Sequence, residues 1–194
     1  MSDFPLISVI ALNYNQAQVT CEFLQSLQKV TYPNLEVIIV DNNSVEDPTQ
    51  KFKEIYPAAQ IVRSPENLGF TGGNNLGMKL SQGEYAFIVN NDTEVTEDIF
   101  ERMLEGFSVD VNVGVVSPKI RYFDQPERIQ FAGFTSINPF TGRNSGIGHL
   151  EIDEGQHDEG RFSPYAHGAA MLVKREVIDN VGIFPEHFFI YYEE

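Results

Sequence analysis

The sequence predicts an α/β protein in which helices cover both faces of a mostly parallel, mixed sheet, giving three layers. Short β-branched apolar runs alternate with helical patterns over the first 120 residues. Such alternation implies right-handed crossovers between parallel strands. Polar clusters follow two of the predicted strands directly, at the end of the sheet where this class binds ligands.

The strands and helices are expected in strict alternation through the first half of the chain. Residues 17–30 show the clearest helical pattern, because Val19, Phe23, Leu27 and Val30 share one face. Strands are expected at residues 6–12, 35–40, 60–62, 84–89 and 113–118. Helices are expected at residues 17–30, 48–56, 75–81 and 97–107, with a glycine-rich loop at 69–77 leading into the third.

The chain loses this regularity from residue 121. Gly, Pro, Asn and Ser are frequent between residues 138 and 148, and order returns with a strand at 169–173 and a helix at 175–181. A connection of this length favours a functional or mobile role. We therefore expect residues 138–160 to be more mobile than the sheet.

The composition restricts the class of protein. Thirteen basic and 28 acidic residues give a net charge of −15, which argues against a nucleic-acid partner. Residues 151–160 hold no Lys or Arg and predict a solvated loop. A lone cysteine, Cys21, forms no internal disulfide. No apolar run approaches the roughly 20 residues that span a bilayer, and no signal sequence is visible, so a cytoplasmic protein is expected.

The first polar cluster, Asp41-Asn42-Asn43-Ser44, follows a buried strand. A carboxylate and amides in this place can bind a base and ribose hydroxyls. The alternative is that Asp41 and Ser44 cap the next helix and shape the turn.

A second candidate is the glycine-rich stretch from Asn67 to Gly77, which includes Gly69, Gly73 and Asn74. Glycines let backbone N–H groups approach a phosphate, and the following helix N-terminus favours negative charge. The alternative is a tight turn with a close helix contact. The stretch matches neither the dinucleotide-binding motif G-x-G-x-x-G nor the P-loop motif.

The third cluster is Asn90-Asn91-Asp92, at the end of another buried strand. Mg²⁺ or Mn²⁺ binds one or two protein carboxylates and completes its shell with phosphate oxygens and water. Such an ion at Asp92 would also reconcile an acidic protein with an anionic substrate. The alternative is that Asp92 caps the next helix.

The end of the chain places aromatic residues before the paired carboxylates Glu193 and Glu194, a pattern expected of a general base beside a sugar. An apolar strand with a polar end is the alternative. The four histidines share no ligand spacing and are interpreted as structural, and His167 is the one candidate among them for a site.

Together these segments resemble the family-two, rhamnosyltransferase-like inverting glycosyltransferases of the GT-A fold. The segments that carry the resemblance are residues 8–15, 40–44, 66–70 with 72–74, 90–95, 167–176 and 182–186. They cover nearly the whole chain in the family's order.

The resemblance implies a role for each site residue. It implies nucleotide-sugar contacts from Asn13, Tyr14, Asn15, Asp41 (reading the base), Asn43, Asn67, Gly69, Gly73, Asn74, Asn90 and Asn91. It implies that Asp92 binds Mg²⁺ or Mn²⁺ as the last carboxylate of a D-x-D motif, although Asn90 replaces the first. Glu194 is the implied base in the pair with Glu193, and His167, Gly168 and Ala169 are placed on the acceptor side.

The resemblance also implies the domain organisation and the partners. Residues 1–194 form one catalytic domain, with a nucleotide-binding half at 1–120 and a partial acceptor-binding half at 121–194 that is expected to continue beyond residue 194. The expected partners are a nucleotide-diphosphate sugar donor and a glycan or lipid-linked acceptor, with peripheral association at the inner face of the membrane. The oligomeric state stays open. Alternatives are a sugar-phosphate nucleotidyltransferase and a non-catalytic nucleotide- or carbohydrate-binding module.

Overall fold

The structure is a computed structural model that describes residues 4–189, and its elements alternate as the sequence predicts. The helices are α1 (Ala17–Leu27), α2 (Thr49–Ile55), α3 (Gly69–Leu80), α4 (Ile99–Gly106) and α5 (Arg175–Val181). The strands are β1 (Ile7–Asn13), β2 (Leu35–Asp41), β3 (Gln60–Arg63), β4 (Tyr85–Asn90), β5 (Val115–Val116), β6 (Ile120–Arg121), β7 (Ile129–Phe131) and β8 (Ala170–Lys174).

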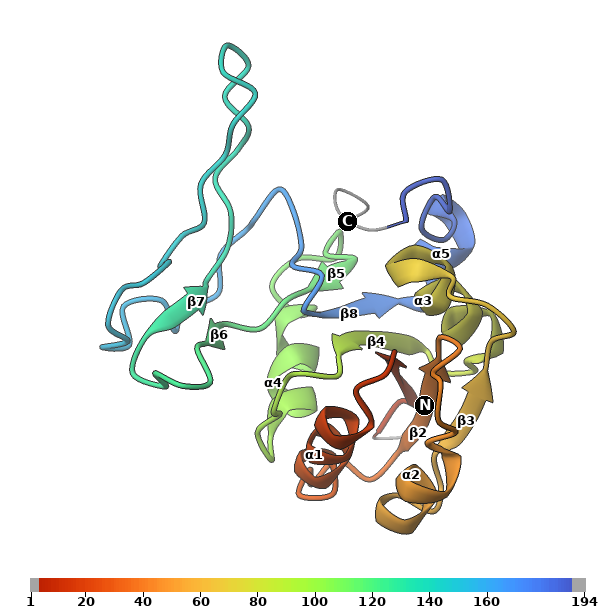
Figure 1. Ribbon diagram of the computed structural model, residues 1–194. Helices are drawn as coiled ribbons and strands as arrows, with labels where there is room; N and C mark the ends of the chain where they lie inside the picture. The colour runs from red at the N-terminus through yellow and green to blue at the C-terminus, as the bar shows by residue number, and fades with distance from the viewer. Residues whose placement is uncertain (1–3, 190–194) are drawn as a thin grey trace.

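Six of the strands form one mixed sheet in the order β3-β2-β1-β4-β8-β5 (Figure 1). The four strands from the first half pair in parallel, whereas β8 runs antiparallel to both β4 and β5. The predicted mostly parallel, mixed sheet is therefore confirmed. Because β8 comes from the second half of the chain, both halves contribute to this one sheet.

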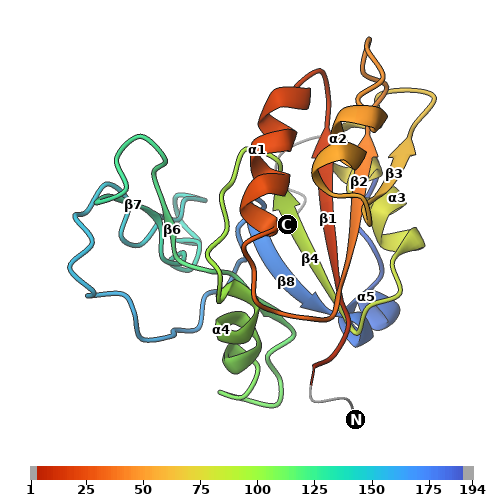
Figure 2. The ribbon, with the colours of Figure 1, turned by 90° about the horizontal axis from the view of Figure 1, so that it is seen from below.

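The apolar side chains of the sheet alternate between two cores, as expected for strands buried on both faces. On one face Val9 and Phe87 pack with residues of α1, α2 and α4. On the other face Ile10 and Ile88 pack with Met78 of α3 and with residues that include Val177 of α5. Figure 2 shows α1 and α2 on one side of the sheet and α3 and α5 on the other. The three-layer arrangement is thus confirmed.

The glycine-rich stretch is helical, so the predicted loop at residues 69–77 is wrong: α3 begins at Gly69. Glycine lowers helix stability by about 1 kcal/mol relative to alanine, and close packing on the sheet overrides this preference here. A Cβ added at Gly77 would lie 2.4 Å from Cγ2 of Ile10, and one at Gly73 would lie 2.9 Å from Cδ2 of Leu12.

The irregular second half contains more pairing than predicted. Strand β7 pairs with β6 in a separate two-stranded sheet, and β5 is limited to two residues. Beyond β7 the chain forms an extended arm, residues 134–146, that projects from the body (Figure 1). Backbone bonds such as Asn138 N to Arg143 O, 2.8 Å, connect its two sides. The polar local sequence does not predict these pairings, because they depend on contacts between residues distant in sequence.

The acidic stretch 151–160 is anchored and is not simply solvated, because Lys119 forms ion pairs with Asp153, at 2.7 Å, and with Asp158. The Asp153 side chain is only 10% exposed. Its hydrogen bond with Lys119 lowers the pKa of Asp153 from 3.8. Burial opposes the charge of Lys119, but the two carboxylates outweigh it and raise the pKa of this lysine.

We expect Lys119→Met to accelerate hydrogen exchange in residues 151–158, since the buried Asp153 carboxylate would lose its cation. Lys79→Met is the control, because Lys79 forms an exposed ion pair with Glu186, outside residues 151–158. In the unmodified protein the same anchoring should persist above pH 3.8 and weaken as the pH falls below it, because the folded state lowers the pKa of Asp153. Unchanged exchange in Lys119→Met would show that the ion pairs do not hold this segment.

No helix among residues 4–189 has both the length and the apolar character needed to cross a bilayer.

Candidate functional site

The polar clusters identified in the sequence converge at the carboxyl end of the parallel strands. Asn13 pairs in register with Asp41, and Asp41 with Arg63, at the ends of β1, β2 and β3. Asn90 ends β4 beside Leu12 of β1. The antiparallel strand β8 starts at this same end, where the Asn90 N–H donates to the carbonyl oxygen of Ala169 at 2.9 Å.

Asp41 is fully buried and is the centre of this arrangement. Its Oδ1 accepts hydrogen bonds from Asn13 Nδ2, at 2.6 Å, and from the hydroxyl of Ser44. Its Oδ2 accepts from the Ser44 N–H and from Arg63 Nε. A carboxylate offers about four lone-pair sites, and four donors occupy them here. Direct recognition of a base by Asp41 therefore stays a prediction that requires one donor to move away.

The helix-cap alternative for Asp41 is wrong, since α2 begins at Thr49 and it is Asp47 that accepts from the Thr49 N–H. The turn-shaping part of that alternative is observed, because Asp41 binds both donors of Ser44. Asp41 thus organises the loop that follows β2.

Arg63 is the residue that the sequence analysis missed. Its guanidinium binds Asp41 Oδ2 at 3.0 Å, Asp47 Oδ2 at 3.1 Å and the Ser44 carbonyl at 2.8 Å, so it connects both ends of the loop. The hydrogen bond with Asp41, together with the charge of Asp47, raises the pKa of Arg63. An arginine at the carboxyl end of a strand, in so acidic a chain, was the available signal.

A cavity of about 240 Å³ opens at this loop and is lined by Asn15, Ala17, Ser44, Val45 and Glu46. Asn15 shapes one wall, because its N–H donates to Ser44 Oγ and its Oδ1 accepts from the Val45 N–H. Asn15 and Asn43 both have positive φ values, 55° and 64°, which asparagine tolerates well. Tyr14 is about half exposed beside this loop.

The residues of the glycine-rich stretch already make packing contacts and hydrogen bonds within the protein. Asn67 Oδ1 accepts from the Gly69 N–H, and the Gly69 carbonyl accepts from Asn42 Nδ2. Gly73 faces Leu12 and Asn42. Asn74 is buried and donates to the Phe70 carbonyl. The close-contact alternative is therefore observed, and the phosphate role of this stretch stays a prediction.

Helix α3 also holds the segment that precedes the predicted base. Asn75 is fully buried and binds both backbone groups of Phe184, at 2.8 and 3.0 Å. The Phe70 N–H donates to the Phe189 carbonyl at 2.9 Å, and the Thr71 hydroxyl donates to the Phe188 carbonyl. Glu193 and Glu194 themselves lie outside the described residues.

The third cluster has two different side-chain environments. Asn91 Nδ2 donates to the hydroxyl of Thr20 at 2.8 Å. Asp92 is exposed. Helix α4 begins at Ile99, directly after Asp98, so the interpretation of Asp92 as its cap is wrong.

The structure is compatible with a divalent ion at Asp92. No group of three His, Cys, Asp or Glu residues within 4–189 is arranged to hold a metal alone. An ion at Asp92 would therefore need oxygen ligands from a bound phosphate or from water, as Mg²⁺ commonly has.

The predicted acceptor-side residues lie next to the same end of the sheet. His167 Nδ1 accepts from the Ala169 N–H at 3.1 Å, and its ring stacks parallel to that of Phe134. Gly168 between them is buried. These contacts bring the base of the arm, β8 and the end of β4 together.

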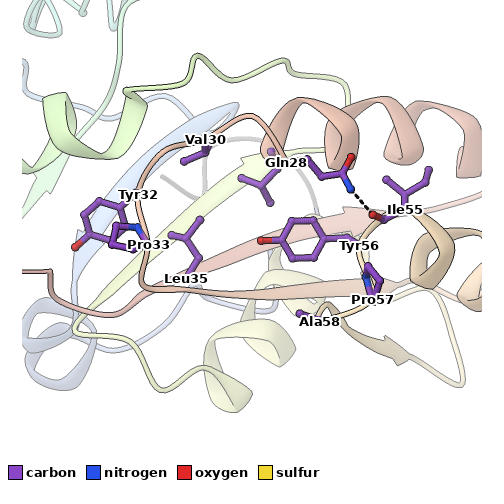
Figure 3. A pocket seen from close by; sticks show the side chains of 10 residues that line it. Gln28, Val30, Tyr32, Pro33, Leu35, Ile55, Tyr56, Pro57 and Ala58 are labelled. Carbon is purple, nitrogen blue, oxygen red and sulfur yellow. Dashed lines mark hydrogen bonds between the residues drawn. The ribbon is translucent and has the colours of Figure 1, made fainter.

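A larger cavity of about 410 Å³ lies elsewhere, beside the amino end of β2 (Figure 3). Its walls include Val30, Tyr32, Leu35 and Tyr56. The Tyr32 hydroxyl donates to the Pro5 carbonyl, and burial raises the pKa of Tyr32 to about 12. This cavity is at the opposite end of the strands from the polar clusters, so it is not part of the candidate site.

Curated relatives align with almost the whole chain. A low-salt glycan biosynthesis hexosyltransferase of Haloferax volcanii is 28% identical over 97% of this chain and 59% of the relative. An N-acetylglucosaminyl-diphospho-decaprenol L-rhamnosyltransferase of Mycobacterium tuberculosis is 23% identical over 97% of this chain and 68% of the relative. The chain thus spans about three fifths to two thirds of these two proteins.

Solved structures share the fold. The mannosyltransferase PcManGT from Pyrobaculum calidifontis, in complex with GDP-Man and Mn²⁺, superposes with a TM-score of 0.67 at 22% identity, over 95% of this chain and 49% of that one. TarS from S. aureus, in complex with UDP, superposes with a TM-score of 0.68 at 19% identity, over 96% of this chain and 52% of that one. The fold is therefore the GT-A fold, as predicted.

The family model for glycosyl transferase family 2 matches residues 8–182, nearly the whole described core with its polar clusters. The chain belongs to glycosyltransferase family 2.

Proposed function

We propose that this chain carries the donor site of an inverting glycosyltransferase that uses a nucleotide-diphosphate sugar and a divalent ion. The observation that supports this most is the convergence of polar residues at the ends of β1, β2 and β4. A cavity of about 240 Å³ opens at this edge, between the segments that follow β1 and β2. Ligands of α/β sheets bind at this end of the strands.

We assign the nucleoside to the cavity beside Ser44, Val45 and Glu46. Tyr14 and Asn15 on one side and Asn43 on the other would contact it, while the buried Asn13–Asp41 pair keeps the loop in shape. In this assignment Asp41 acts mainly through the loop, because its oxygens already have four donors. Asn90 and Asn91 would lie towards the diphosphate.

The diphosphate would lie near Asp92, which would share Mg²⁺ or Mn²⁺ with the phosphate oxygens. When bound, the ion supplies positive charge that stabilises the leaving diphosphate. A structural neighbour was solved in complex with GDP-Man and Mn²⁺, which supports the proposal of a divalent ion at this site.

Transfer would be a single displacement with inversion of the anomeric carbon. The acceptor hydroxyl oxygen forms a bond to that carbon as the bond to the diphosphate oxygen breaks, and Glu194 takes the hydroxyl proton. We propose a hexosyl or deoxyhexosyl group on UDP or dTDP as the donor, and a glycan or lipid-linked acceptor beside His167, Gly168 and Ala169 at the inner face of the membrane.

The first test is calorimetric titration of the protein with UDP, dTDP and GDP, with and without Mn²⁺. We expect binding of UDP or dTDP that weakens at least about tenfold in a chelator, since an acidic protein otherwise repels the diphosphate. Asp92→Asn should remove the metal dependence. Glu94→Gln is the matched control, because Glu94 is also exposed but lies two residues further along.

Equal affinity with and without the ion would contradict the metal-bridged site. Binding without transfer to any acceptor, in the protein expressed from its complete open reading frame, would instead favour the non-catalytic binding module. Membership of glycosyltransferase family 2 disfavours a sugar-phosphate nucleotidyltransferase.

A further inference from the structure

A chain of hydrogen bonds runs through the buried layer beneath the site and connects its nucleoside side with its metal side. Asn13 Nδ2 donates to Asp41 Oδ1 at 2.6 Å. The Thr20 hydroxyl donates to Asn13 Oδ1 at 2.9 Å. Asn91 Nδ2 donates to the Thr20 hydroxyl oxygen at 2.8 Å.

The direction of each bond follows from the carboxylate at one end. Asp41 accepts only, so Asn13 must turn its NH₂ group towards it and its oxygen towards Thr20. Thr20 has one proton, which the Asn13 oxygen receives at 2.9 Å, whereas the alternative contact with the Gln16 carbonyl is longer at 3.4 Å. The lone pair of the hydroxyl is then directed to the NH₂ group of Asn91.

Three members of this hydrogen-bond chain are fully buried. Asp41, Asn13 and Thr20 are each 0% exposed. Thr20 belongs to α1, which covers one face of the sheet and supplies none of the predicted site residues (Figure 2). Buried polar groups are expensive unless paired, and here each group serves as the partner of the next.

We propose that Thr20 is a positioning residue: it holds Asn91, and through Asn91 the adjacent Asp92, in register with the Asp41 loop. The proposal rests on the proposed metal-dependent donor site. It predicts that removing the Thr20 hydroxyl, which is fully buried, changes the metal requirement of nucleotide binding. Partners that orient a metal ligand typically change metal affinity by about 10- to 100-fold when lost.

The test measures the Mn²⁺ concentration that gives half-maximal UDP binding. Thr20→Val keeps nearly the same volume but removes the hydroxyl, and we expect this concentration to rise about tenfold. Thr20→Ser keeps the hydroxyl and should restore the requirement of the unmodified protein. Cys21→Ala, at the next buried position of α1, controls for loss of packing and should leave the requirement unchanged.

Asn91→Ala provides a second route, because it removes the other end of the same bond without altering α1. Asn91→Ala should raise the Mn²⁺ requirement as Thr20→Val does, and the double variant should be no worse than either single one. A Thr20→Val protein with an unchanged requirement, or additive losses in the double variant, would overturn the proposal. If Thr20→Val fails to fold, Thr20→Ala removes the same hydroxyl and decides in its place, because Asn91 itself is placed towards the diphosphate.

The test separates this proposal from the proposed function. Absence of Mn²⁺-dependent binding of both UDP and dTDP in the unmodified protein would refute the donor site itself. Normal metal dependence in the unmodified protein, with no change in Thr20→Val or Asn91→Ala, would refute only the positioning role.

Discussion

Glu194→Gln, in the protein expressed from its complete open reading frame, is expected to lower the rate of sugar transfer by about 10²- to 10⁴-fold. The amide has nearly the shape of the carboxylate but cannot take the acceptor proton. Donor affinity should change little, because the proposed donor site lies at the ends of β1, β2 and β4. Initial rates with radiolabelled donor, together with calorimetry of UDP binding, measure the two effects separately.

Glu193→Gln is the control for this substitution, since it removes the neighbouring carboxylate of the same pair. We expect it to reduce transfer less than Glu194→Gln does. A larger loss in Glu193→Gln would assign the base to Glu193, and full activity in both variants would remove the pair from the mechanism.

Gly69→Ala is expected to lower kcat on the order of a hundredfold with little change in the KM for the donor. Gly69 has φ +67°, and an added Cβ would lie 2.5 Å from the Phe189 carbonyl oxygen and 2.6 Å from its ring. The segment that leads to Glu193 and Glu194 must then shift, and a misplacement of about 1 Å can cost about that factor in rate.

Gly142→Ala is a matched control for the backbone effect. Gly142 has nearly the same φ, +65°, but nothing lies within 4 Å of an added Cβ, because it is in the arm. The Gly142→Ala variant should lose at most about 1–2 kcal/mol of folding stability and should keep the kcat of the unmodified protein. If Gly69→Ala instead raises the donor KM and leaves kcat unchanged, Gly69 serves the phosphates, as the sequence pattern predicts.

Most of the sheet could be predicted because its signals are local. The runs that became β1, β2 and β4 are apolar on both faces, and each ends abruptly in polar residues. Strand alternation with helices then determines parallel pairing, so Asn13, Asp41 and Asn90 had to meet at one end. Prediction weakened where the chain carries mixed polar composition, and β6, β7 and the arm are examples.

The glycines of α3 show why local propensity misled. Four glycines in twelve helical residues favour a loop by propensity alone. The helix forms because Gly73 and Gly77 allow it to approach β1 more closely than any side chain would. This close approach depends on a contact between elements distant in sequence, so local propensity does not predict it.

By itself the sequence determined the layered α/β class and the polar residues that lie at the ends of its parallel strands, because hydrophobic period and strand termination are properties of short segments. The tertiary structure alone decided how those residues are used. It assigned the four lone-pair sites of Asp41 to donors that include Arg63, and it placed Thr20 between Asn13 and Asn91. Hydrogen-bond partners of buried groups are set by which elements pack together, and no local pattern encodes that.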